Sequence, residues 1–328
     1  MFKALLLQKA DDGSTQASIA TLDEAQLPAG EVEIEIAYST LNYKDALAIT
    51  GRGPVVRQWP MVPGIDLVGT VVRSDNSEFP NGTDVIVNGH GMGELHWGGL
   101  AQKARVPAGW LTRKPDAMSA WDAASIGTAG YTAMLSVMAL ERHGVRADQG
   151  PVLVTGANGG VGSFAVALLA RRGYEVHAST GRVEERDRLL GLGATEVVDR
   201  ATLSESGKPL QKEKWAGAVD CVGSHTLANI CAQTRYGGVV TACGLAQGMD
   251  FPATVAPFIL RGVTLAGVDS VYAPQALREE AWKRLAEETD ASVREQIAYT
   301  ASLEDCIELA HQLIRGEVKG RVVIDLRK

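Results

Sequence analysis

Cysteine is scarce in this sequence. Its 328 residues include four cysteines, and no two of them form a Cys-x-x-Cys pair: Cys221, Cys231, Cys243 and Cys306. This spacing excludes a structural zinc cluster recognisable from sequence and gives no sign of a disulfide framework. Scattered cysteines are typical of buried free thiols in a reducing compartment. We therefore expect a soluble, cytoplasmic protein whose thiols are buried and unbridged.

Positive charge is also in short supply. The chain has 32 Lys and Arg against 39 Asp and Glu, a formal net charge of −7. This balance argues against nucleic acid or an anionic membrane as the main partner. The apolar run near the N-terminus, Phe2–Leu7, is too short for a signal peptide or a membrane span. We expect neither a nucleic-acid partner nor a membrane partner.

The sequence does contain an ordinary globular composition, 45% hydrophobic and 22% charged. Because single cores stop growing at about 250–300 residues, two structural units are expected. Up to about Ser125 the signals are mostly β. Val32, Ile34 and Ile36 alternate with polar residues, as in a strand with one solvated face. Turns rich in glycine and proline separate the other segments, which predicts a compact, loop-rich β domain.

Strands alternate with helices from about residue 126 onward. Ser119 and Asp122 have capping-box spacing, so a helix is expected to begin there. Six strand candidates follow, most of them separated by helical stretches: Val152–Thr155, Glu175–Thr180, Glu196–Asp199, Ala218–Val222, Val239–Cys243 and Val263–Val268. This alternation predicts a parallel, doubly wound sheet.

The C-terminal segment combines a helix with a final strand. Apolar residues recur at helical spacing within Ser302–Gly316, and the strand candidate Arg321–Leu326 follows. We expect this segment to return to the first domain, which makes that domain discontinuous. The predicted domains are residues 1–125 with 292–328, and residues 126–291.

Glycines crowd the turn that follows the first of the six strands. Residues 156–162 contain three glycines in GxxGxxG spacing and a fourth between them, and an apolar helix, Ser163–Arg172, comes next. Without side chains the backbone can approach a pyrophosphate, while the helix N-terminus supplies free N–H groups. A tight turn without a ligand is the alternative, which five further strands disfavour. The expected contacts are those of the whole turn: Gly156, Asn158, Gly159, Gly160, Val161 and Gly162.

The end of the second of these strands distinguishes between the two nicotinamide cofactors. Chains that bind NAD usually place an acid there, which accepts a hydrogen bond from the ribose 2′-OH. This chain has the sequence STGR at residues 179–182, without a carboxylate. Hydroxyls and a guanidinium suit a 2′-phosphate, although a solvated helix-start residue is an alternative for the arginine. NADPH is therefore expected, with these contacts: Ser179, Thr180, Arg182 and, just past the third strand, Arg200.

Seven longer motifs are spread over nearly the whole chain: LNYKDALAITG (41–51), PMVPGIDLVGTV (61–72), HWGGLAQKARV (96–106), IGTAGYTAMLSVMALE (126–141), TGANGGVGS (155–163), YGGVVTACGLA (236–246) and PFILRGVTLAGVDS (257–270). They resemble the medium-chain dehydrogenase/reductase superfamily, and more closely its zinc-free acrylyl-CoA reductase family, whose members are also called quinone oxidoreductases. The resemblance implies an α/β fold in which a Rossmann domain accompanies a β-rich, GroES-like catalytic domain. It also implies a homodimer, to which the apolar edge strand at residues 263–268 is suited.

The zinc ligands of other superfamily members have no counterpart here. Those relatives place a cysteine early in the catalytic domain and a His-Glu pair after a glycine further on. The matching stretches read NYKD (42–45) and GID (64–66), and the first 220 residues contain no cysteine. His90 and His96 lack a third neighbouring ligand in the sequence. The resemblance therefore implies no metal.

Without a Lewis acid, the substrate must accept a hydride readily by itself. A C=C bond conjugated to a carbonyl does so, whereas alcohol dehydrogenation needs a group that deprotonates the alcohol. By resemblance we expect NADPH-dependent reduction of a short 2-enoyl-CoA, acrylyl-CoA to propanoyl-CoA. An NADPH:quinone oxidoreductase and a non-catalytic NADPH-binding protein remain as alternatives. Arg52 and Arg57 are candidates for contacting CoA phosphates.

The resemblance assigns four polar residues to the chemistry: Tyr43, Asp45, Asp66 and Arg321. Tyr43 is expected to donate to the developing oxyanion and to touch the nicotinamide. The two aspartates are expected to orient Tyr43 and a charged Arg321. Structural alternatives are a packing aromatic for Tyr43, an N-cap for Asp45 and a turn cap for Asp66. For Arg321 the alternative is an ion pair between domains. Three more residues are implied near the nicotinamide half of the cofactor: Leu245, Ile259 and Ser270.

Overall fold

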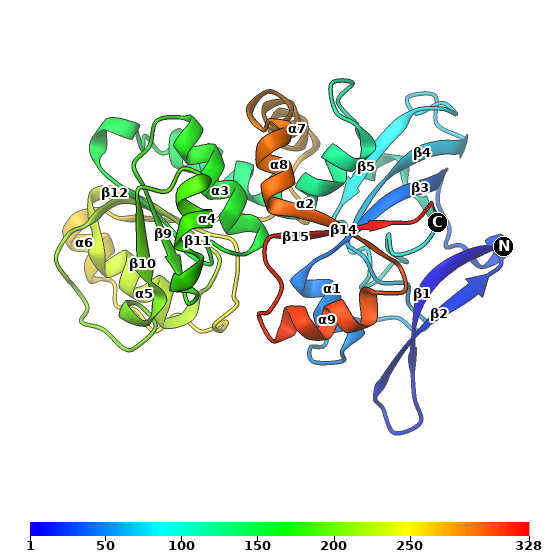
Figure 1. The fold of residues 1–328 in the computed structure, drawn as a ribbon, viewed down its shortest axis with the longest axis horizontal. Helices are drawn as coiled ribbons and strands as arrows, with labels where there is room; N and C mark the ends of the chain where they lie inside the picture. The colour runs from blue at the N-terminus through cyan, green and yellow to red at the C-terminus, as the bar shows by residue number, and fades with distance from the viewer. Residues whose placement is uncertain (328) are drawn as a thin grey trace. The chain divides into compact units, whose positions relative to one another are not determined.

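The computed structural model describes residues 1–327, which divide into two compact units (Figure 1). The first unit comprises Met1–Thr128, Ser270–Ala286 and the chain from Asp290 onward. The second comprises Ala129–Asp269 and Glu287–Thr289. The first unit is therefore discontinuous in sequence, and the C-terminal segment returns to it.

A seven-stranded sheet is the framework of the first unit. Six strands follow one another in space and the seventh, β6, also pairs with β3: β14 (Ala298–Ser302), β15 (Arg321–Asp325), β3 (Val32–Leu41), β4 (Asp66–Ser74), β5 (Asp84–Asn88), β7 (Thr112–Arg113) and β6 (Lys103–Val106). In β3, Val32, Ile34 and Ile36 are at most 2% exposed, while Glu35 is solvated. This confirms the predicted alternation. The final strand, β15, pairs with β3 and β14, which confirms its predicted return.

Helices and a hairpin complete the first unit. The strands β1 (Phe2–Lys9) and β2 (Thr15–Leu22) form an antiparallel hairpin. The helix α1 (Tyr43–Ile49) packs against α9 (Cys306–Ile314), and α8 (Ala291–Ile297) precedes β14. Because apolar residues of α1, α9, β3, β4 and β15 share one core, the two ends of the chain are fixed to each other.

The segment Ser270–Ala286 was predicted to lie in the dinucleotide-binding domain, and the structure assigns it to the first unit. It contains most of α7 (Gln275–Glu288). Two side chains of α7 that are at most 1% exposed reach the end of β5. Arg278 Nη1 donates to the Asn88 carbonyl (2.8 Å), and Trp282 Nε1 donates to Asn88 Oδ1 (3.2 Å). These long-range contacts, invisible in local sequence, account for the difference.

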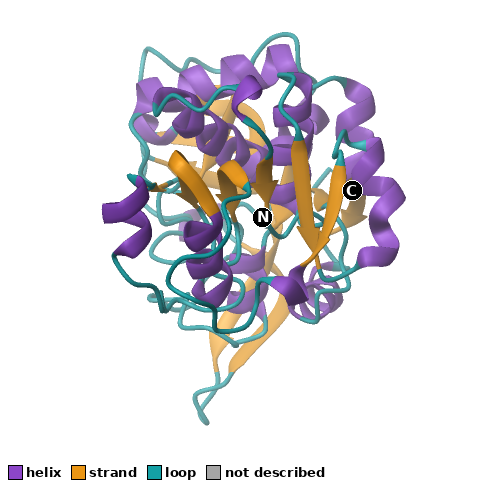
Figure 2. Cartoon of the chain, turned by 90° about the vertical axis from the view of Figure 1, so that its left-hand side faces the viewer, coloured by secondary structure: helices purple, strands orange, loops and turns teal. Residues whose placement is uncertain are grey.

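The second unit contains a six-stranded parallel sheet with helices around it (Figure 2). In spatial order the strands are β10 (Glu196–Asp199), β9 (Val176–Thr180), β8 (Val152–Val154), β11 (Trp215–Asp220), β12 (Thr234–Ala242) and β13 (Thr264–Gly267). The helices between them are α3 (Gly160–Arg171), α4 (Arg186–Gly191), α5 (Ser224–Gln233) and α6 (Ala256–Arg261). This confirms the predicted doubly wound sheet. The strand order reverses between β8 and β11, where such sheets bind ligands.

Short 3-10 turns connect several of these elements: η1 (Glu24–Gln26), η2 (Ala108–Trp110), η3 (Ala147–Gln149), η4 (Val183–Glu185) and η5 (Arg200–Thr202). The longest helix is α2 (Ala120–Arg142) among those of the described residues. It begins with the predicted capping box, since Ser119 N donates to Asp122 Oδ2 (2.9 Å) and Asp122 N donates to Ser119 Oγ (3.0 Å). Its length and composition would suit a membrane span, but 89% of its apolar window is buried inside the protein.

Candidate active site

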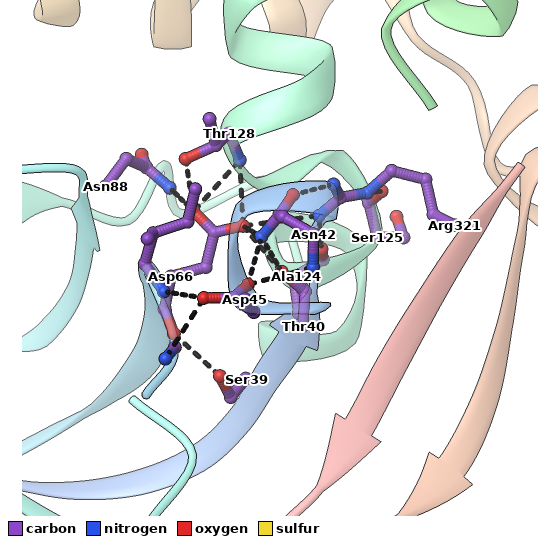
Figure 3. Close-up of polar contacts among 12 residues, drawn as sticks. Ser39, Thr40, Asn42, Asp45, Asp66, Asn88, Ala124, Ser125, Thr128 and Arg321 are labelled. Atoms are coloured by element: carbon purple, nitrogen blue, oxygen red, sulfur yellow. Dashed lines mark hydrogen bonds and ion pairs between the residues drawn. The ribbon is translucent and has the colours of Figure 1, made fainter. Parts of the chain in front are cut away.

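The carboxylate of Asp66 is the centre of a buried polar network in the first unit (Figure 3). Asp66 begins β4 and is 1% exposed. Five residues donate hydrogen bonds to its two carboxylate oxygens: Thr40 (2.5 Å), Asn42 (3.0 Å), Asn88 (2.7 Å), Thr128 (3.0 Å) and Arg321 (3.4 Å). A carboxylate offers about four lone-pair sites. All are in use, so Asp66 anchors its neighbours and is not placed to take a proton from a substrate.

Arg321 links this anchor to the start of α1. It begins β15 and is 3% exposed. Its Nη1 donates to Asn42 Oδ1 (2.7 Å), while its Nε donates to the carbonyl of Ser125 (3.1 Å). Both charged partners, Arg321 and Asp66, belong to the first unit, so the pair is not the ion pair between domains considered above. Its role is to hold Asn42 from one side while Asp66 holds it from the other.

Burial acts on both members of this ion pair. It raises the pKa of Asp66, but the charge of Arg321 and hydrogen bonds from Thr128, among others, outweigh burial and hold the pKa below its usual value of 3.8. Burial lowers the pKa of Arg321, which the charge of Asp66 opposes. A guanidinium keeps its proton even in such surroundings. We therefore treat the pair as ionic, as the lowered pKa of Asp66 indicates.

Asp45 organises the first turn of α1. It is the third residue of the helix, and the N-cap is Asn42, so the alternative that made Asp45 an N-cap is wrong. Asn42 N donates to Asp45 Oδ2 (2.8 Å), and the N–H groups of Gly64 (3.1 Å) and Ile65 (3.0 Å) donate to Oδ1. Burial raises the pKa of Asp45 to about 7; hydrogen bonds from Asn42 oppose burial, and the charge of Asp66 reinforces it.

Gly127 lies in α2 against the same network. Its backbone angles, φ 45° and ψ −156°, are not helical and favour glycine. A Cβ atom at this position would lie 2.2 Å from Arg321 Nη2 and 2.7 Å from Asp66 Oδ2. The bend of α2 and the missing side chain therefore make room for the ion pair.

Tyr43 is the first residue of α1 and follows directly after Asn42. It is 44% exposed, unlike the buried residues beneath it. The next residue, Lys44, forms an ion pair with Glu94 and so secures the helix start from another side. The network thus fixes the backbone that carries an accessible phenol, a group that can donate a hydrogen bond or a proton.

Several network residues were not predicted from the sequence. They are polar side chains from three elements, β3, β5 and α2, and from the N-cap of α1: Thr40, Asn88, Thr128 and Asn42. Asn42 gave a local signal, because asparagine followed three residues later by an acid is an N-terminal helix pattern. Thr40, Asn88 and Thr128 gave none, since their contacts depend on strand pairing and on the bend of α2.

In the second unit, the predicted glycine turn joins β8 to α3 at the strand-order reversal. Gly156 has φ 59°, and a Cβ at Gly162 would lie 2.3 Å from the Gly156 carbonyl oxygen. The backbone at Gly156 therefore favours glycine, and the close approach at Gly162 leaves no room for a side chain. Gly159 is the N-cap of α3, whose first N–H groups lack helical partners. This cradle of backbone donors fits a pyrophosphate.

The end of β9 is tied to the glycine turn. Ala157 N donates to the Ser179 carbonyl (3.1 Å), and Asn158 Nδ2 donates to Thr180 Oγ1 (2.9 Å). The guanidinium of Arg200 lies over Gly181, where a Cβ would come within 2.4 Å of its Nε. Polar and cationic groups thus gather where a 2′-phosphate is expected, and NADPH fits these residues.

One arginine beside the glycine turn was not predicted from the sequence. Arg188, on α4, donates from Nη1 to Asn158 Oδ1 (3.1 Å) and from Nη2 to Ser163 Oγ (3.2 Å). Burial lowers the pKa of Arg188; the charge of Glu185 opposes burial, whereas that of Arg182 reinforces it. Arg188 therefore connects the turn to α3 and adds positive charge beside it. Its sequence context, RDRLL, resembles that of an ordinary surface helix and gave no signal.

The three residues predicted near the nicotinamide half occupy different places. Leu245 follows β12 and is 51% exposed, and Ile259 lies on α6 and is 73% exposed. Both belong to the second unit. Ser270 belongs to the first unit, where its carbonyl accepts a hydrogen bond from Arg278 Nη2 (3.2 Å).

Known proteins resemble this chain over its whole length. The alcohol dehydrogenase GroES-like domain family matches residues 28–116, and the zinc-binding dehydrogenase family matches residues 160–287. The acrylyl-CoA reductase AcuI of Ruegeria pomeroyi is 49% identical over 99% of this chain and 99% of its own. The structure of Escherichia coli YhdH with bound NADPH has a TM-score of 0.97 at 50% identity, covering 99% of this chain and 100% of that chain. Bacillus subtilis YhfP with NAD bound has a TM-score of 0.95 at 42% identity, covering 99% of both.

Zinc, which one of these family descriptions implies, does not fit the side chains present. A zinc site in a protein takes three or four nitrogen, sulfur or oxygen ligands. Within residues 1–327, no group of three His, Cys, Asp or Glu side chains is placed to hold a metal ion. His90 and His96 both contact the ring of Trp110, at centroid distances of 5.3 Å and 5.0 Å. His96 Nδ1 also pairs with the Trp97 carbonyl (2.9 Å).

Proposed function

The chain belongs to the acrylyl-CoA reductase family of the medium-chain dehydrogenase/reductase superfamily, and we propose that it reduces acrylyl-CoA to propanoyl-CoA with NADPH. The observation that carries this proposal is the 49% identity to acrylyl-CoA reductase AcuI over 99% of both chains. The glycine turn after β8 and the cationic end of β9 support NADPH as the cofactor. The buried network around Asp66 supports a preorganised catalytic site in the first unit.

The reaction adds a hydride and a proton across a C=C bond. NADPH, when bound, supplies the hydride, which is added to the β-carbon of the enoyl thioester. Negative charge then collects on the thioester oxygen, and a proton is added to the α-carbon. The chain must therefore supply a hydrogen-bond donor for that oxygen, since a donor placed where charge develops lowers the barrier.

We assign this donation to the Tyr43 phenol. It is exposed at the start of α1, and a network of buried groups fixes the helix start. Asp66 and Arg321 hold Asn42, the N-cap, and Asp45 holds the first turn. We therefore propose that Tyr43 contacts the substrate and that Asp45, Asp66 and Arg321 are positioning residues.

The cofactor contacts are proposed on the same basis. The backbone of the glycine turn would hold the pyrophosphate, with Asn158 tying the turn to β9. Arg182 and Arg200 would pair with the 2′-phosphate, because guanidinium groups bind phosphate through two parallel hydrogen bonds. Leu245 and Ile259 offer apolar surface of the kind that a nicotinamide ring packs against.

The proposal is tested by comparing substrates and cofactors side by side. NADPH oxidation would be followed with acrylyl-CoA, crotonyl-CoA and a benzoquinone, and then repeated with NADH. We expect the largest kcat/KM with acrylyl-CoA, and a much lower value with NADH because it lacks the 2′-phosphate. Equal or higher efficiency with the quinone would contradict the substrate assignment. Faster turnover with NADH would contradict the roles of Arg182 and Arg200.

We also propose that the protein is a homodimer. The edge strand β13 carries unpaired backbone groups, and exposed edges of this kind tend to pair. Nearby apolar side chains support the idea, since Val255 is 65% exposed and Leu260 is 62% exposed. Sedimentation equilibrium should give twice the chain mass, and L260D should give the monomer mass. L95D, at an exposed leucine of the first unit, is the control and should remain dimeric. A monomeric wild-type protein would contradict the proposal.

Finally, we propose that the protein acts in the cytoplasm. All four cysteines are free in the structure, which a reducing compartment would maintain. Fractionation of cells that express the tagged chain at its natural level should recover it with cytoplasmic markers. Recovery with an extracytoplasmic fraction would contradict this assignment.

A further inference from the structure

Two of the four cysteines lie side by side at the carboxyl ends of neighbouring strands. Cys221 follows β11 and Cys243 follows β12, and their sulfur atoms are 3.8 Å apart. Both are partly exposed, whereas Cys231 and Cys306 are 0% exposed. The expectation that all four thiols are buried is therefore wrong for this pair.

The backbone around the pair is already close enough for a disulfide. The parallel pairing of β11 with β12 places Asp220 opposite Ala242, and Cys243 N donates to the Asp220 carbonyl (2.9 Å). Neighbouring strands lie about 4.8 Å apart, and disulfides form over Cα separations of about 4.4–6.8 Å. Gly244 keeps this approach open, because a Cβ there would lie 2.3 Å from the Cys221 carbonyl oxygen. To form the bond, the sulfur atoms must approach from 3.8 Å to about 2.05 Å.

The pair also adjoins the cofactor-binding turn. A Cβ built on Gly156 would lie 3.5 Å from the Cβ of Cys221, which is ordinary contact distance. The amide of Cys221 donates to Thr155 Oγ1 (3.0 Å), on the residue before that glycine. Leu245, one of the proposed nicotinamide contacts, is two residues after Cys243. A change in the position of Cys221 would therefore shift the backbone of the glycine turn.

We propose that Cys221 and Cys243 form an oxidation site at which a hydroperoxide converts the dithiol to a disulfide, and that this disulfide weakens NADPH binding. This inference concerns a modification of the cofactor-binding unit and does not depend on which substrate is reduced.

The chemistry is a two-electron oxidation in two steps. The sulfur of Cys243 attacks the O–O bond of hydrogen peroxide, becomes a sulfenic acid and releases one water molecule. The thiol of Cys221 then attacks that sulfur, the S–S bond forms, and the S–O bond breaks with release of a second water. Together the two thiols lose two electrons and two protons, and one peroxide is reduced to two waters.

The hydrogen bonding supports this order of events. The pKa of Cys221 is raised above its ordinary value, first because of its hydrogen bond with Cys243 and then because of burial. Cys221 therefore keeps its proton and is not suited to the first attack. Because the thiolate is the reactive form, the first attack is assigned to Cys243. Coupling between sites is reciprocal in free energy, so bound NADPH should in turn favour the dithiol over the disulfide.

The first test counts thiols. The reduced protein would be treated with hydrogen peroxide, with and without NADPH, then denatured and assayed for free thiols and for intact mass. We expect the protein to lose two thiols and the mass of two hydrogen atoms. Peptide mapping should locate the disulfide between Cys221 and Cys243, and dithiothreitol should restore both thiols. Cys231 and Cys306 serve as internal controls and should stay reduced. Four remaining thiols, or oxygen added to one cysteine without a disulfide, would overturn the proposal.

The second test connects the disulfide to the cofactor. NADPH affinity would be measured by fluorescence before and after peroxide treatment of the wild type, C221S, C243S and the buried-site control C231S. We expect Kd to rise about fivefold or more in the wild type and in C231S, within the usual range of coupling between sites. In C221S and C243S, the treated and untreated Kd values should agree. An oxidised wild type with unchanged Kd, or serine variants that respond like the wild type, would overturn the link to cofactor binding.

Discussion

At the scale of single residues, the site contains two kinds of polar group: buried groups that position their neighbours, and an exposed group that can contact a substrate. Asp66 accepts hydrogen bonds from five residues, and Arg321 donates to Asn42 and to main-chain carbonyls. Both side chains are buried, so neither is accessible to a substrate. The exposed phenol of Tyr43 is different, because its position is fixed by the helix start while its side chain is accessible.

This difference predicts the effect of Y43F. Removing the hydroxyl should lower kcat on the order of 100-fold, the usual contribution of a positioned donor or acid. The KM for NADPH should change little, since the aromatic ring is retained. Steady-state kinetics at saturating NADPH measures both. Tyr299, in the same unit and 43% exposed, provides a matched control, and Y299F should retain wild-type turnover. Full activity of Y43F would remove Tyr43 from the chemistry.

Arg188 leads to a second prediction at this scale. R188Q removes charged hydrogen bonds to Asn158 and Ser163, each worth about 1.5–3 kcal/mol. The glycine turn would lose a tie to α4, so KM for NADPH should rise about tenfold or more, with a smaller change in kcat. R186Q, at an exposed position on the same helix, is the control and should behave as wild type. Equal KM values for the two variants would contradict a positioning role.

At the scale of elements, the start of α1 and the bend of α2 converge on the same ion pair. The capping box between Asn42 and Asp45 defines where α1 begins. The non-helical backbone at Gly127 lets α2 pass the ion pair and brings the amide of Thr128 onto Asp66. An irregular residue inside a helix is therefore a structural requirement of the network.

The bend can be tested with G127A. The alanine should strain the backbone, because φ is 45° at this position. It should also collide with Arg321, because its Cβ would lie 2.2 Å from Nη2. G144A is a matched control: Gly144 has φ +87° and nothing within 4 Å of its Cβ position. Each variant should lose about 1–3 kcal/mol of stability from backbone strain, measured by urea unfolding. Activity should fall at least tenfold more in G127A than in G144A. Equal activities would show that Arg321 tolerates displacement.

At the scale of the whole molecule, one chain builds two units, and the first is assembled from segments at both ends of the sequence. Its buried acids include Asp45 and Asp66, and both carboxylates accept hydrogen bonds from Asn42. The charge of Asp66 contributes to the raised pKa of Asp45, after burial itself. The stability of the protein should therefore depend on pH.

The sign of that dependence follows from the pKa of Asp45, which changes from 3.8 to about 7 on folding. Between these values the folded protein keeps a proton that the unfolded chain has released. Its stability therefore falls as pH rises, by up to about 1.4 kcal/mol per pH unit. Asparagine cannot lose a proton, so D45N should lack this slope.

Urea unfolding measures the effect for the wild type and D45N from about pH 4 to about pH 7, and for the wild type and D305N also below about pH 4. The free energy of unfolding of D45N relative to the wild type should increase across the first of these ranges. D305N is a control of opposite sign, because hydrogen bonds from Ser302 lower the pKa of Asp305. Its difference from the wild type should shrink as pH falls below about 4, where the stabilising ionised form is lost. A constant difference for D45N would contradict a raised pKa.

Local patterns determined much of this protein. The alternation in β3, the capping box of α2, the six parallel strands and the glycine turn were all predicted from residues that are neighbours in sequence. Each is set by short-range chemistry: strand periodicity, helix capping or the backbone freedom of glycine. The family resemblance added the residues of the network, Asp66 and Arg321 among them, but not their contacts.

Only the tertiary structure decided how those residues act. Arg321 and Asp66 are 255 positions apart and meet because β15 pairs with β3 beside β4. Arg188, the Cys221–Cys243 pair and the attachment of Ser270–Ala286 to the first unit likewise depend on contacts between distant segments. Such contacts form when distant segments pack together, and no local pattern in the sequence records which segments become neighbours.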